Sequence, residues 1–338
     1  MSIKTPTSSI ENQSKFEQQD PTVRICVPSR NEYIALMLQN GGLKTRKISQ
    51  RYYKSQGTGN YENVDVLPFR ANEIPTLVAE TPRTESEWLH AGFAGQDLVK
   101  EAGVDSSIIP IAIIPLSNGG KSKVDWKCLV KEESSIRKPS DLIGKIIGTQ
   151  APKITQEWLI ANGIDPQQVE IRMATGSGEA YLKIGRIDAL VDVVDTGKSR
   201  DENKLRELEG VVFQSQGLLI ANRIQWSRGD VREKLREIAV NTLGSILSVK
   251  TIMINADVPN DKLESLKNNP LFKGVQSPTI VDLGNGFSSY AIAIPEEQKS
   301  AVNYQLLKAG ADGILAIPTE SYIDKNAVKS HLLVSINE

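Results

Sequence analysis

The chain has 338 residues, enough for two or three domains of ordinary size. Hydrophobic residues make up 39% of it and charged residues 24%, the balance of a globular protein in water. The formal net charge is −1, which excludes a strong overall attraction to nucleic acid or to an anionic membrane. With two cysteines and two histidines, the sequence also argues against a disulfide framework and a multi-histidine metal site.

The amino-terminal segment, residues 1–21, is polar and lacks the apolar stretch of a signal peptide. We expect it to be a disordered tail. The most apolar run of the chain, residues 108–116, is far shorter than the roughly 20 residues of a membrane-spanning helix. These features predict a cytoplasmic protein that has neither a membrane nor a nucleic acid as a partner.

Strands and helices alternate in the first part of the chain, which predicts a mostly parallel sheet. The strands expected there are residues 23–27, 64–69 and 91–95, each followed by a helix. We assign residues 22–115 to a first lobe. A long amphipathic helix at 231–249 returns to that lobe, so residues 206–249 are assigned to it as well.

Residues 116–205 repeat this alternation and are assigned to a second lobe. Its expected strands are residues 126–130, 146–149, 169–173 and 189–194. The last of these strands is apolar until Asp192, and it ends close to a turn rich in polar residues. A ligand site is therefore expected where this strand ends.

Residues 250–325 form a smaller unit whose expected element order is β-α-β-β-α-β, the ferredoxin-like pattern. The helices of such a domain cover one face of its sheet and leave the other open. We expect Ile252, Ile254, Ala291 and Ala293 on the strands of this sheet, and self-association through its open face. Residues 326–338 are assigned to a carboxy-terminal tail.

The segment after the strand at 189–194 has the residue types of a sugar-phosphate site. Asp192 and Asp195 can accept hydrogen bonds from a pair of ribose hydroxyls. The turn of Thr196, Gly197, Lys198 and Ser199 offers backbone N–H groups, hydroxyls and a cation to a phosphate. Upstream, Gly176 and Gly178 permit close approach of the backbone to a ligand, while Ser177 and Glu179 provide polar side chains.

Several segments together resemble one known family, the long form of ATP phosphoribosyltransferase. Around the two acids, the similar segments are Gly176-Ser177-Gly178-Glu179, Gly185 to Asp192, Thr196-Gly197 and Asn203-Lys204-Leu205. Elsewhere they are residues 66–75, 92–98, 141–145, 276–279 and 308–315. The resemblance covers roughly residues 22–325.

This resemblance implies an α/β fold whose two α/β lobes resemble a type II periplasmic-binding-protein core, followed by a ferredoxin-like, ACT-like domain. It implies transfer of a 5-phosphoribosyl group from phosphoribosyl pyrophosphate to N1 of ATP, the first step of histidine biosynthesis. Mg²⁺ would be held mainly by the pyrophosphate. The resemblance also implies a homo-oligomer, a dimer or a hexamer, and inhibition by an amino-acid effector.

Carried over residue by residue, the resemblance implies catalytic roles for Asp192, Asp195 and Glu179, with Glu179 also near the metal. The residues implied to bind phosphoribosyl pyrophosphate are Gly176, Ser177, Asp192, Asp195, Thr196, Gly197, Lys198 and Ser199. The nucleotide acceptor would be bound by Arg30, Arg70 and Asp97.

The sequence departs from the family pattern mainly in the half that would hold ATP. Ser29-Arg30-Asn31 stands where the family usually has Lys-Gly-Arg, and Gln96 stands where it usually has a cation. Loss of these cations would weaken triphosphate binding, because each charge-assisted contact contributes about 1.5–3 kcal/mol. The sequence therefore leaves two alternatives open: a divergent paralogue acting on another heterocycle, and a ligand-binding or regulatory protein without catalysis.

Overall fold

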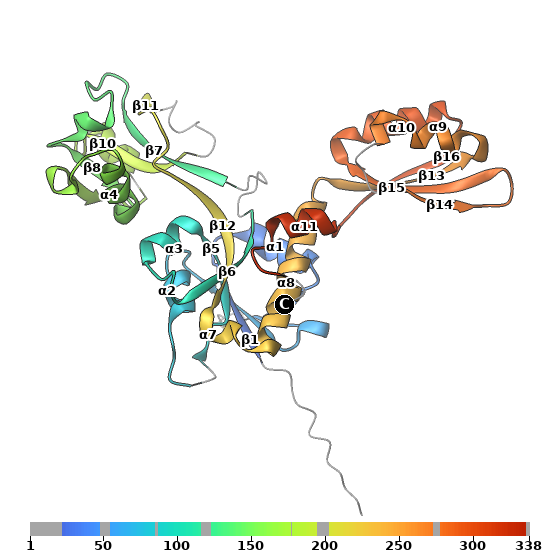
Figure 1. The fold of residues 1–338 in the computed structure, drawn as a ribbon, viewed down its shortest axis with the longest axis horizontal. Coiled ribbons are helices and arrows are strands. Elements are labelled where there is room, and N and C mark those ends of the chain that lie inside the picture. The colour runs from blue at the N-terminus through green and yellow to red at the C-terminus, as the bar shows by residue number, and fades with distance from the viewer. Residues whose placement is uncertain are drawn as a thin grey trace, which may run out of the picture.

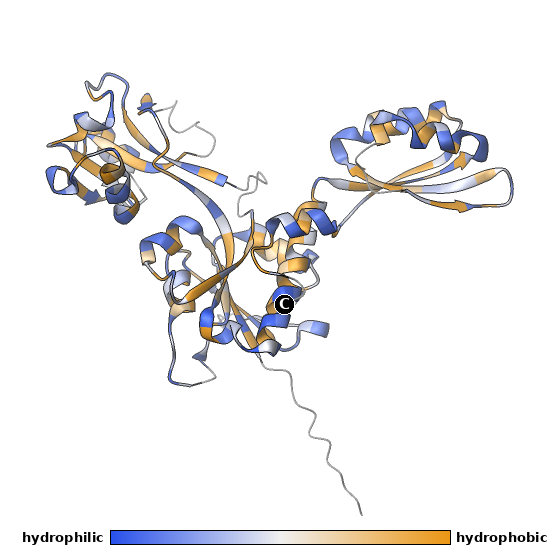
Figure 2. Cartoon of the chain, viewed as in Figure 1, coloured by the Kyte–Doolittle hydropathy of each residue, from blue (hydrophilic) through white to orange (hydrophobic). Residues whose placement is uncertain are grey.

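The computed structural model describes residues 22–47, 55–84, 87–115, 123–176, 178–194, 203–272 and 278–335. Figure 1 shows three α/β bodies, of which two lobes share a long strand and the third stands apart at the end of a long helix. Figure 2 shows apolar residues concentrated where helices pack on sheets. Within the described residues, no helix is both long and apolar enough to cross a membrane.

The first lobe is a sheet with three parallel strands at its centre, β4, β1 and β5. Its strands are β1 (Val23–Pro28), β2 (Thr45–Lys47), β3 (Ser55–Gly57), β4 (Val64–Phe69), β5 (Ala91–Gly95) and β6 (Ile108–Ile113). Its helices are α1 (Glu32–Asn40), α2 (Ile74–Ala79), α3 (Gln96–Ala102), α7 (Arg223–Trp226) and α8 (Gly229–Ser248). The centre of β1 is buried on both faces, as expected of a strand that helices cover from two sides.

The second lobe has its own parallel core, in which β8 lies between β10 and β9. Its strands are β7 (Lys123–Lys131), β8 (Ile146–Thr149), β9 (Glu170–Met173), β10 (Ala189–Val194) and β11 (Leu205–Glu207), and its helices are α4 (Pro152–Ala161) and α5 (Gly178–Lys183). A hydrophobic core between α4 and the sheet holds the lobe together, with Trp126, Ile147, Leu159 and Val191 among its buried residues.

Strand β12 (Phe213–Asn222) joins the two lobes. Its first residues, up to Gln216, pair with β7 of the second lobe, whereas the residues from Gly217 onward pair with β5 and β6 of the first. We expected the chain to re-enter the first lobe at residue 206, but β11 and the start of β12 still belong to the sheet of the second lobe. The polar run of Gln214, Ser215 and Gln216 near the start of β12 conceals the strand, because its continuous apolar run begins only at Leu218.

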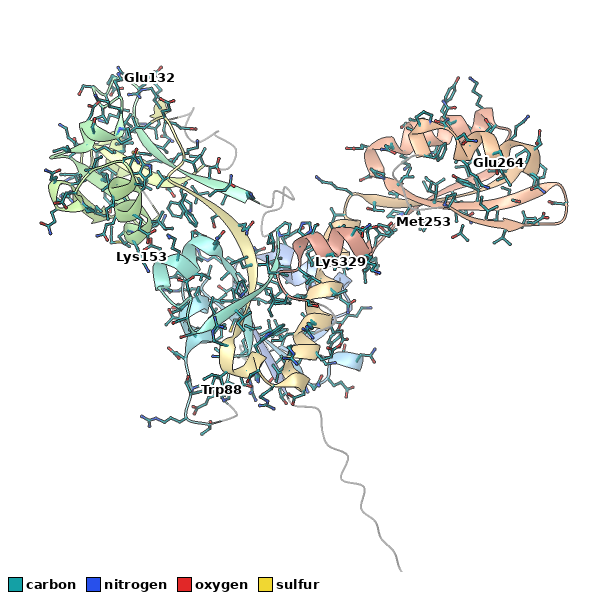
Figure 3. The ribbon with its side chains drawn as sticks, viewed as in Figure 1. Trp88, Glu132, Lys153, Met253, Glu264 and Lys329 are labelled. Atoms are coloured by element: carbon teal, nitrogen blue, oxygen red, sulfur yellow. The ribbon has the colours of Figure 1, made fainter. Side chains whose placement is uncertain are left out.

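The third body has the predicted β-α-β-β-α-β order. Its elements are β13 (Thr251–Pro259), α9 (Leu263–Lys267), β14 (Thr279–Asp282), β15 (Phe287–Pro295), α10 (Lys299–Lys308) and β16 (Asp312–Pro318), and its strand order is β14-β15-β13-β16. In Figure 3, Glu264 lies on the helical side of this domain and Met253 on the sheet. The expected fold class, two α/β lobes and a ferredoxin-like domain, is confirmed.

The four strand residues expected from the sequence lie on β13 and β15, but on opposite faces of the sheet. Ile252 and Ile254 are buried with the helices, in the same core as Ile292 and Ile294. Because side chains alternate along a strand, the opposite face takes the residues between them. The apolar residues of that open face are Met253, Val281, Ala291, Ala293, Leu315 and Ile317, and the polar residues Asn255, Thr279 and Ser289 lie among them.

The carboxy-terminal segment is not only a tail. Helix α11 (Lys325–His331) returns to the first lobe and packs on α8. Its Val328 is buried in the core of that lobe, and Leu333 N–H donates to Ile111 O at 2.8 Å. The sequence contains a signal for this helix, because the Asp324 side chain caps it by accepting a hydrogen bond from Ala327 N–H at 2.7 Å.

Candidate active site

A cavity of about 950 Å³ opens in the first lobe where its parallel strands end. The loops that follow β1, β4 and β5 line it, and a sheet of this kind offers its ligand site at the carboxyl ends of the strands. Its lining residues are Pro28, Ser29, Arg30, Asn31, Glu32, Tyr33, Arg70, Ala71, Asn72, Ala94, Gly95 and Leu98.

The two arginines predicted from the sequence, Arg30 and Arg70, line this cavity together. Each follows a strand of a parallel pair, and Ser29 N–H donates to Phe69 O at 2.8 Å, which joins the two loops. Asn31 ends the first loop by capping α1, with Ile34 N–H donating to its Oδ1 at 3.2 Å. Two guanidinium groups on short, tied loops suit a ligand with several phosphates.

Asp97 lies beside this cavity, in the first turn of α3, between two residues that line it, Gly95 and Leu98. Its carboxylate is bound to the shared strand, since Ser215 Oγ donates to Asp97 Oδ1 at 2.7 Å. Asp97 N–H in turn donates to Ser215 Oγ at 3.2 Å. Its carboxylate thus links the first lobe to the part of β12 that pairs with the second.

A second cavity, of about 590 Å³, lies in the second lobe, again where parallel strands end. Its lining residues are Gln150, Gly176, Gly178, Glu179, Ala180, Lys183, Asp192 and Asn203. Three predicted site residues therefore meet here, namely Gly176, Glu179 and Asp192. Asn203, which was not predicted as a site residue, belongs to a segment that resembles the family and lines the cavity as well. A Cβ on Gly178 would clash with Leu190, so this glycine lets α5 pack closely against β10.

The carboxyl of Asp192 is affected by its surroundings in this cavity. Burial raises the pKa of the Asp192 carboxyl above its ordinary value, and the negative charge of Glu179 raises it further, although the hydrogen bond from Val193 N–H at 2.8 Å opposes the change. Asn203 Nδ2 donates to Glu179 Oε2 at 3.2 Å, which holds that carboxylate at the cavity. A pair of oxygen-rich acceptors of this kind suits sugar hydroxyls or a hydrated cation.

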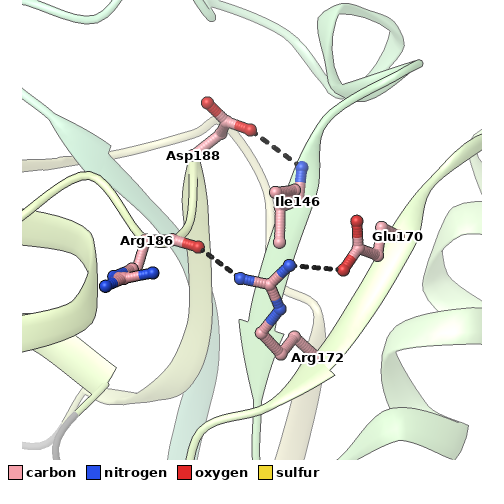
Figure 4. A network of polar contacts seen from close by, with 5 residues as sticks. All are labelled: Ile146, Glu170, Arg172, Arg186 and Asp188. Carbon is pink, nitrogen blue, oxygen red and sulfur yellow. Dashed lines mark hydrogen bonds and ion pairs between the residues drawn. The ribbon is translucent and has the colours of Figure 1, made fainter.

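The turn before β10 fixes where Asp192 lies. Figure 4 shows that Ile146 N–H donates to Asp188 Oδ2, at 2.9 Å, and that Arg172 Nη1 donates to Arg186 O, at 2.8 Å. Arg172 also pairs with Glu170 on its own strand. These contacts join the turn to β8 and β9. They fix the start of β10, and this strand brings Asp192 to the cavity. In the segment from Gly185 to Asp192, Arg186 and Asp188 therefore stabilise the fold, and Asp192 lines the cavity.

Six predicted site residues lie outside the described part of the chain: Ser177, Asp195, Thr196, Gly197, Lys198 and Ser199. Other residues line the cavities although the sequence did not single them out. Gln150 follows β8, and Lys183 lies in the last turn of α5. Gln150 carries a sequence signal, because parallel strands end on one edge of the sheet and each places a residue there.

Among the described residues, no group of three or more His, Cys, Asp and Glu side chains could hold a metal ion. Glu179 and Asp192 can still supply one or two oxygen ligands. Mg²⁺ is usually bound in this way, by few protein carboxylates together with waters and substrate phosphates. The residues present therefore fit a metal that arrives with a phosphorylated ligand.

Comparisons with known proteins point to one family. The family model for ATP phosphoribosyltransferase matches residues 70–244, and that for the C-terminal domain of the same family matches residues 249–321. The ATP phosphoribosyltransferase of Methanocella arvoryzae is 28% identical over 89% of this chain and 99% of its own, and that of Thermodesulfovibrio yellowstonii is 29% identical over 78% and 85%.

A structural relative gives the same fold. The ATP phosphoribosyl transferase (HisG:HisZ) complex of Thermotoga maritima superimposes with a TM-score of 0.51, covering 65% of this chain and 98% of the matched chain, at 19% identity. The family models together span both lobes and the ferredoxin-like domain. The chain belongs to the ATP phosphoribosyltransferase family, in its long form with the C-terminal domain.

Proposed function

We propose that this protein transfers the 5-phosphoribosyl group of phosphoribosyl pyrophosphate to N1 of ATP, the first step of histidine biosynthesis. The observation that carries the proposal is the contrast between its two cavities. One contains two arginines and the other contains two carboxylates, and each lies at the carboxyl ends of parallel strands. An enzyme with two phosphorylated substrates needs two such sites.

The cavity of the first lobe would hold ATP. Arg30 and Arg70, which both line this cavity, would bind its phosphates and would compensate for the missing cations at Ser29 and Gln96. Asp97 belongs to this side through α3, whose first turn it fixes to Ser215. Tyr33 offers the cavity an aromatic side chain, and aromatic rings commonly stack on nucleotide bases.

The cavity of the second lobe would hold phosphoribosyl pyrophosphate. Asp192 would accept hydrogen bonds from the ribose hydroxyls, and Glu179 would lie near the ribose or its metal. The turn of Thr196, Gly197, Lys198 and Ser199, with Asp195 before it, follows β10 in the sequence and would bind the 5′-phosphate. Gly176 and Ser177 would complete the site from the loop before α5.

In the reaction, N1 of the adenine ring forms a bond to C1′ of the ribose, while the bond from C1′ to the pyrophosphate oxygen breaks and its electron pair leaves with pyrophosphate. The transition state resembles an oxocarbenium ion, as in glycosidic chemistry generally. We propose that the protein acts by orientation and charge stabilisation, without a covalent intermediate on one of its own side chains.

The family uses metal ions, and we propose Mg²⁺ for this chain. When bound, the ion neutralises the charge that develops on the leaving pyrophosphate. Glu179 and Asp192 would contribute at most a few ligands. The remaining ligands would be phosphate oxygens and waters.

A pyrophosphate-release assay tests the activity. Phosphoribosyl pyrophosphate and ATP together, with Mg²⁺, are expected to yield one pyrophosphate per phosphoribosyl-ATP formed. The same donor with other nucleotides and heterocycles provides the comparison. Turnover with another heterocycle and not with ATP would overturn the acceptor, and no turnover with any acceptor would favour a ligand-binding protein.

Donor binding has its own test. Asp192→Asn should weaken the binding of phosphoribosyl pyrophosphate with Mg²⁺ at least about tenfold, since a charged hydrogen bond is lost. Asp165→Asn is a matched control in the same lobe, because Asn caps the short turn at Gln167 as well as Asp does. Titration calorimetry that gives equal affinity for both variants would remove Asp192 from the site.

The C-terminal domain, near residues 250–325, would serve assembly and regulation. Its open face carries apolar side chains, and a dimer or hexamer would cover them. Leu315, on this face, and Leu307, on α10 on the opposite side, are similarly exposed, at 58% and 63%. Leu315→Glu should therefore reduce the mass measured by light scattering, whereas Leu307→Glu should not. An amino-acid effector would act here only if it binds two assembly states unequally.

A further inference from the structure

Helix α3 connects the two cavities. It begins directly after Gly95, and both Gly95 and Leu98 line the cavity of the first lobe. It ends beside α4 of the second lobe. Helix α4 begins two residues after Gln150, which lines the other cavity. Figure 3 labels Lys153, near the start of α4, on the side of the second lobe that faces the first. The meeting point of these helices therefore lies on a short path between the two cavities.

The start of α4 lacks a cap of its own. Ala151 occupies the N-cap position and has no side-chain acceptor, so the N–H groups of the first turn need another partner. Glu101 of α3 provides it. Ile154 N–H donates to Glu101 Oε1 at 2.7 Å, and Lys153 N–H donates to Glu101 Oε2 at 3.2 Å. One carboxylate of the first lobe thus caps a helix of the second with both of its oxygens.

The position of Glu101 in its own helix supports this role. It lies in the last turn of α3, where a negative charge is unfavourable because the helix dipole is negative at that end. The same charge is favourable at the amino-terminal end of α4. The residue is therefore electrostatically suited to α4 and not to α3.

Neighbouring contacts strengthen the same joint. Lys100 forms an ion pair with Glu157 of α4, and its ammonium lies 5.7 Å from the centre of the Phe213 ring at the start of β12. At its other end, α3 is held to β12 by the contact of Asp97 with Ser215. Both ends of α3 are therefore bound to elements that pair or pack with the second lobe.

We propose that Glu101 is a positioning residue, which sets the separation of the two cavities by fixing the start of α4 to the first lobe. The proposal rests on the proposed function in one respect: transfer requires the acceptor nitrogen and C1′ to approach to about 3–3.5 Å. Since each substrate lies on a different lobe, the angle between the lobes decides that approach. Glu101 touches neither cavity, and it acts through α4.

The test compares two carboxylates at the same joint. In Glu101→Gln, only the amide oxygen can accept, and the NH₂ group faces the second helix N–H. In the matched control, Glu157→Gln, the ion pair with Lys100 is lost but the cap of α4 stays. Glu101→Gln should lower kcat about tenfold or more and leave the Kd of phosphoribosyl pyrophosphate within about twofold, whereas Glu157→Gln should change neither beyond about twofold.

A distance measurement that does not need turnover completes the test. Spin labels on Leu36→Cys in the first lobe and Ile143→Cys in the second report the separation of the lobes; both positions are exposed and both native cysteines are buried. The distance distribution should shift or broaden in Glu101→Gln and remain unchanged in Glu157→Gln. If it is unchanged in both, the positioning role is overturned, whatever happens to kcat. If the distance distribution shifts but the unmodified protein transfers no phosphoribosyl group, the proposed function is wrong, while the role of Glu101 in positioning the lobes is supported.

A second variant separates positioning from simple helix capping. Adding Ala151→Ser to Glu101→Gln gives α4 a local cap but does not restore the link between the lobes. The melting temperature should then recover, while the distance distribution and kcat should stay altered. Recovery of all three would show that α4 needed only a cap, and it would overturn the proposal.

Discussion

The two cavities are built in the same way and lined in opposite ways. Each lies at the carboxyl ends of parallel strands, between short loops and the first turns of helices. The cavity of the first lobe is the larger, about 950 Å³ against about 590 Å³, and contains Arg30 and Arg70. The other contains Glu179 and Asp192. The fold thus decides where the cavities lie, and a few residues near the strand ends decide which charges line each of them.

The largest effect is expected in the cavity of the first lobe. Arg70→Ala removes a guanidinium group from the proposed phosphate site, and a charge-assisted contact contributes about 1.5–3 kcal/mol, so the KM for ATP should rise about 10- to 100-fold. The KM for phosphoribosyl pyrophosphate should stay nearly constant. Arg83→Ala, an exposed arginine of the same lobe outside the cavity, is the control for steady-state kinetics. An equal rise in both KM values would mean that the two cavities do not divide the substrates.

The second prediction concerns the carboxylates of the other cavity. Burial and the charge of Glu179 raise the pKa of Asp192, so its carboxylate should be lost, as pH falls, at a higher pH than that of an ordinary aspartate. Donor binding that depends on the carboxylate should weaken over the same range. Glu179→Gln removes one cause of the shift and should move the midpoint to lower pH.

Calorimetric Kd values across pH for Glu179→Gln and for the exposed Glu132→Gln make this comparison. The donor phosphates also titrate, but equally for both proteins, so the difference between the variants reports Asp192. The interaction of the two acids at this cavity would be refuted by identical midpoints.

The last prediction concerns folding stability instead of substrate binding, and it again separates the lobes. His90 is buried in the first lobe, where Arg24 N–H donates to its Nδ1 at 3.0 Å; burial, then the charges of Arg24 and Arg228, lower its pKa to about 4. Above pH 6.5 the histidine is neutral in both folded and unfolded chains. Between pH 6.5 and 4 only the unfolded chain takes up the proton, so folding stability should fall on acidification, by up to about 3 kcal/mol.

Urea unfolding from pH 7 to pH 4 measures this loss. The variant His90→Asn keeps an acceptor for Arg24 N–H and does not titrate, so its stability should depend less on pH. The second lobe contains no histidine. Spectroscopic probes placed in that lobe should therefore detect little local loss of stability between pH 7 and pH 4. Equal slopes for both proteins would assign the acid sensitivity to other groups.

Much of the fold could be predicted because the relevant signals are local. The apolar strands of both lobes and the order of elements in the C-terminal domain follow from hydrophobic periodicity and turn residues. Asp192 and Glu179 meet at one cavity because Asp192 lies near the end of β10 and Glu179 lies in the first turn of α5, which packs against β10.

What could not be predicted depends on contacts distant in the sequence. The crossing strand β12 is polar at residues 214–216, near its start, so its pairing with the second lobe could not be predicted from an apolar pattern. Nothing near Glu101 indicates that its partner is the start of a helix about fifty residues later, in another lobe. The orientation of Ile252 and Ile254 was missed because a strand pattern alone does not tell which face the helices cover.

Because α11 returns to the first lobe, the ferredoxin-like domain is inserted between two segments of that lobe, and this decides how the domain can be removed. The ferredoxin-like domain leaves and rejoins the first lobe at one point: Thr319 Oγ1 donates to Thr251 O at 2.8 Å, and Ser248 Oγ donates to Glu320 O at 2.9 Å. A domain whose two ends meet can be excised or exchanged as a cassette, with a short linker closing the gap. Truncation after residue 249 is a different operation, because it also strips Val328 from the core of the first lobe.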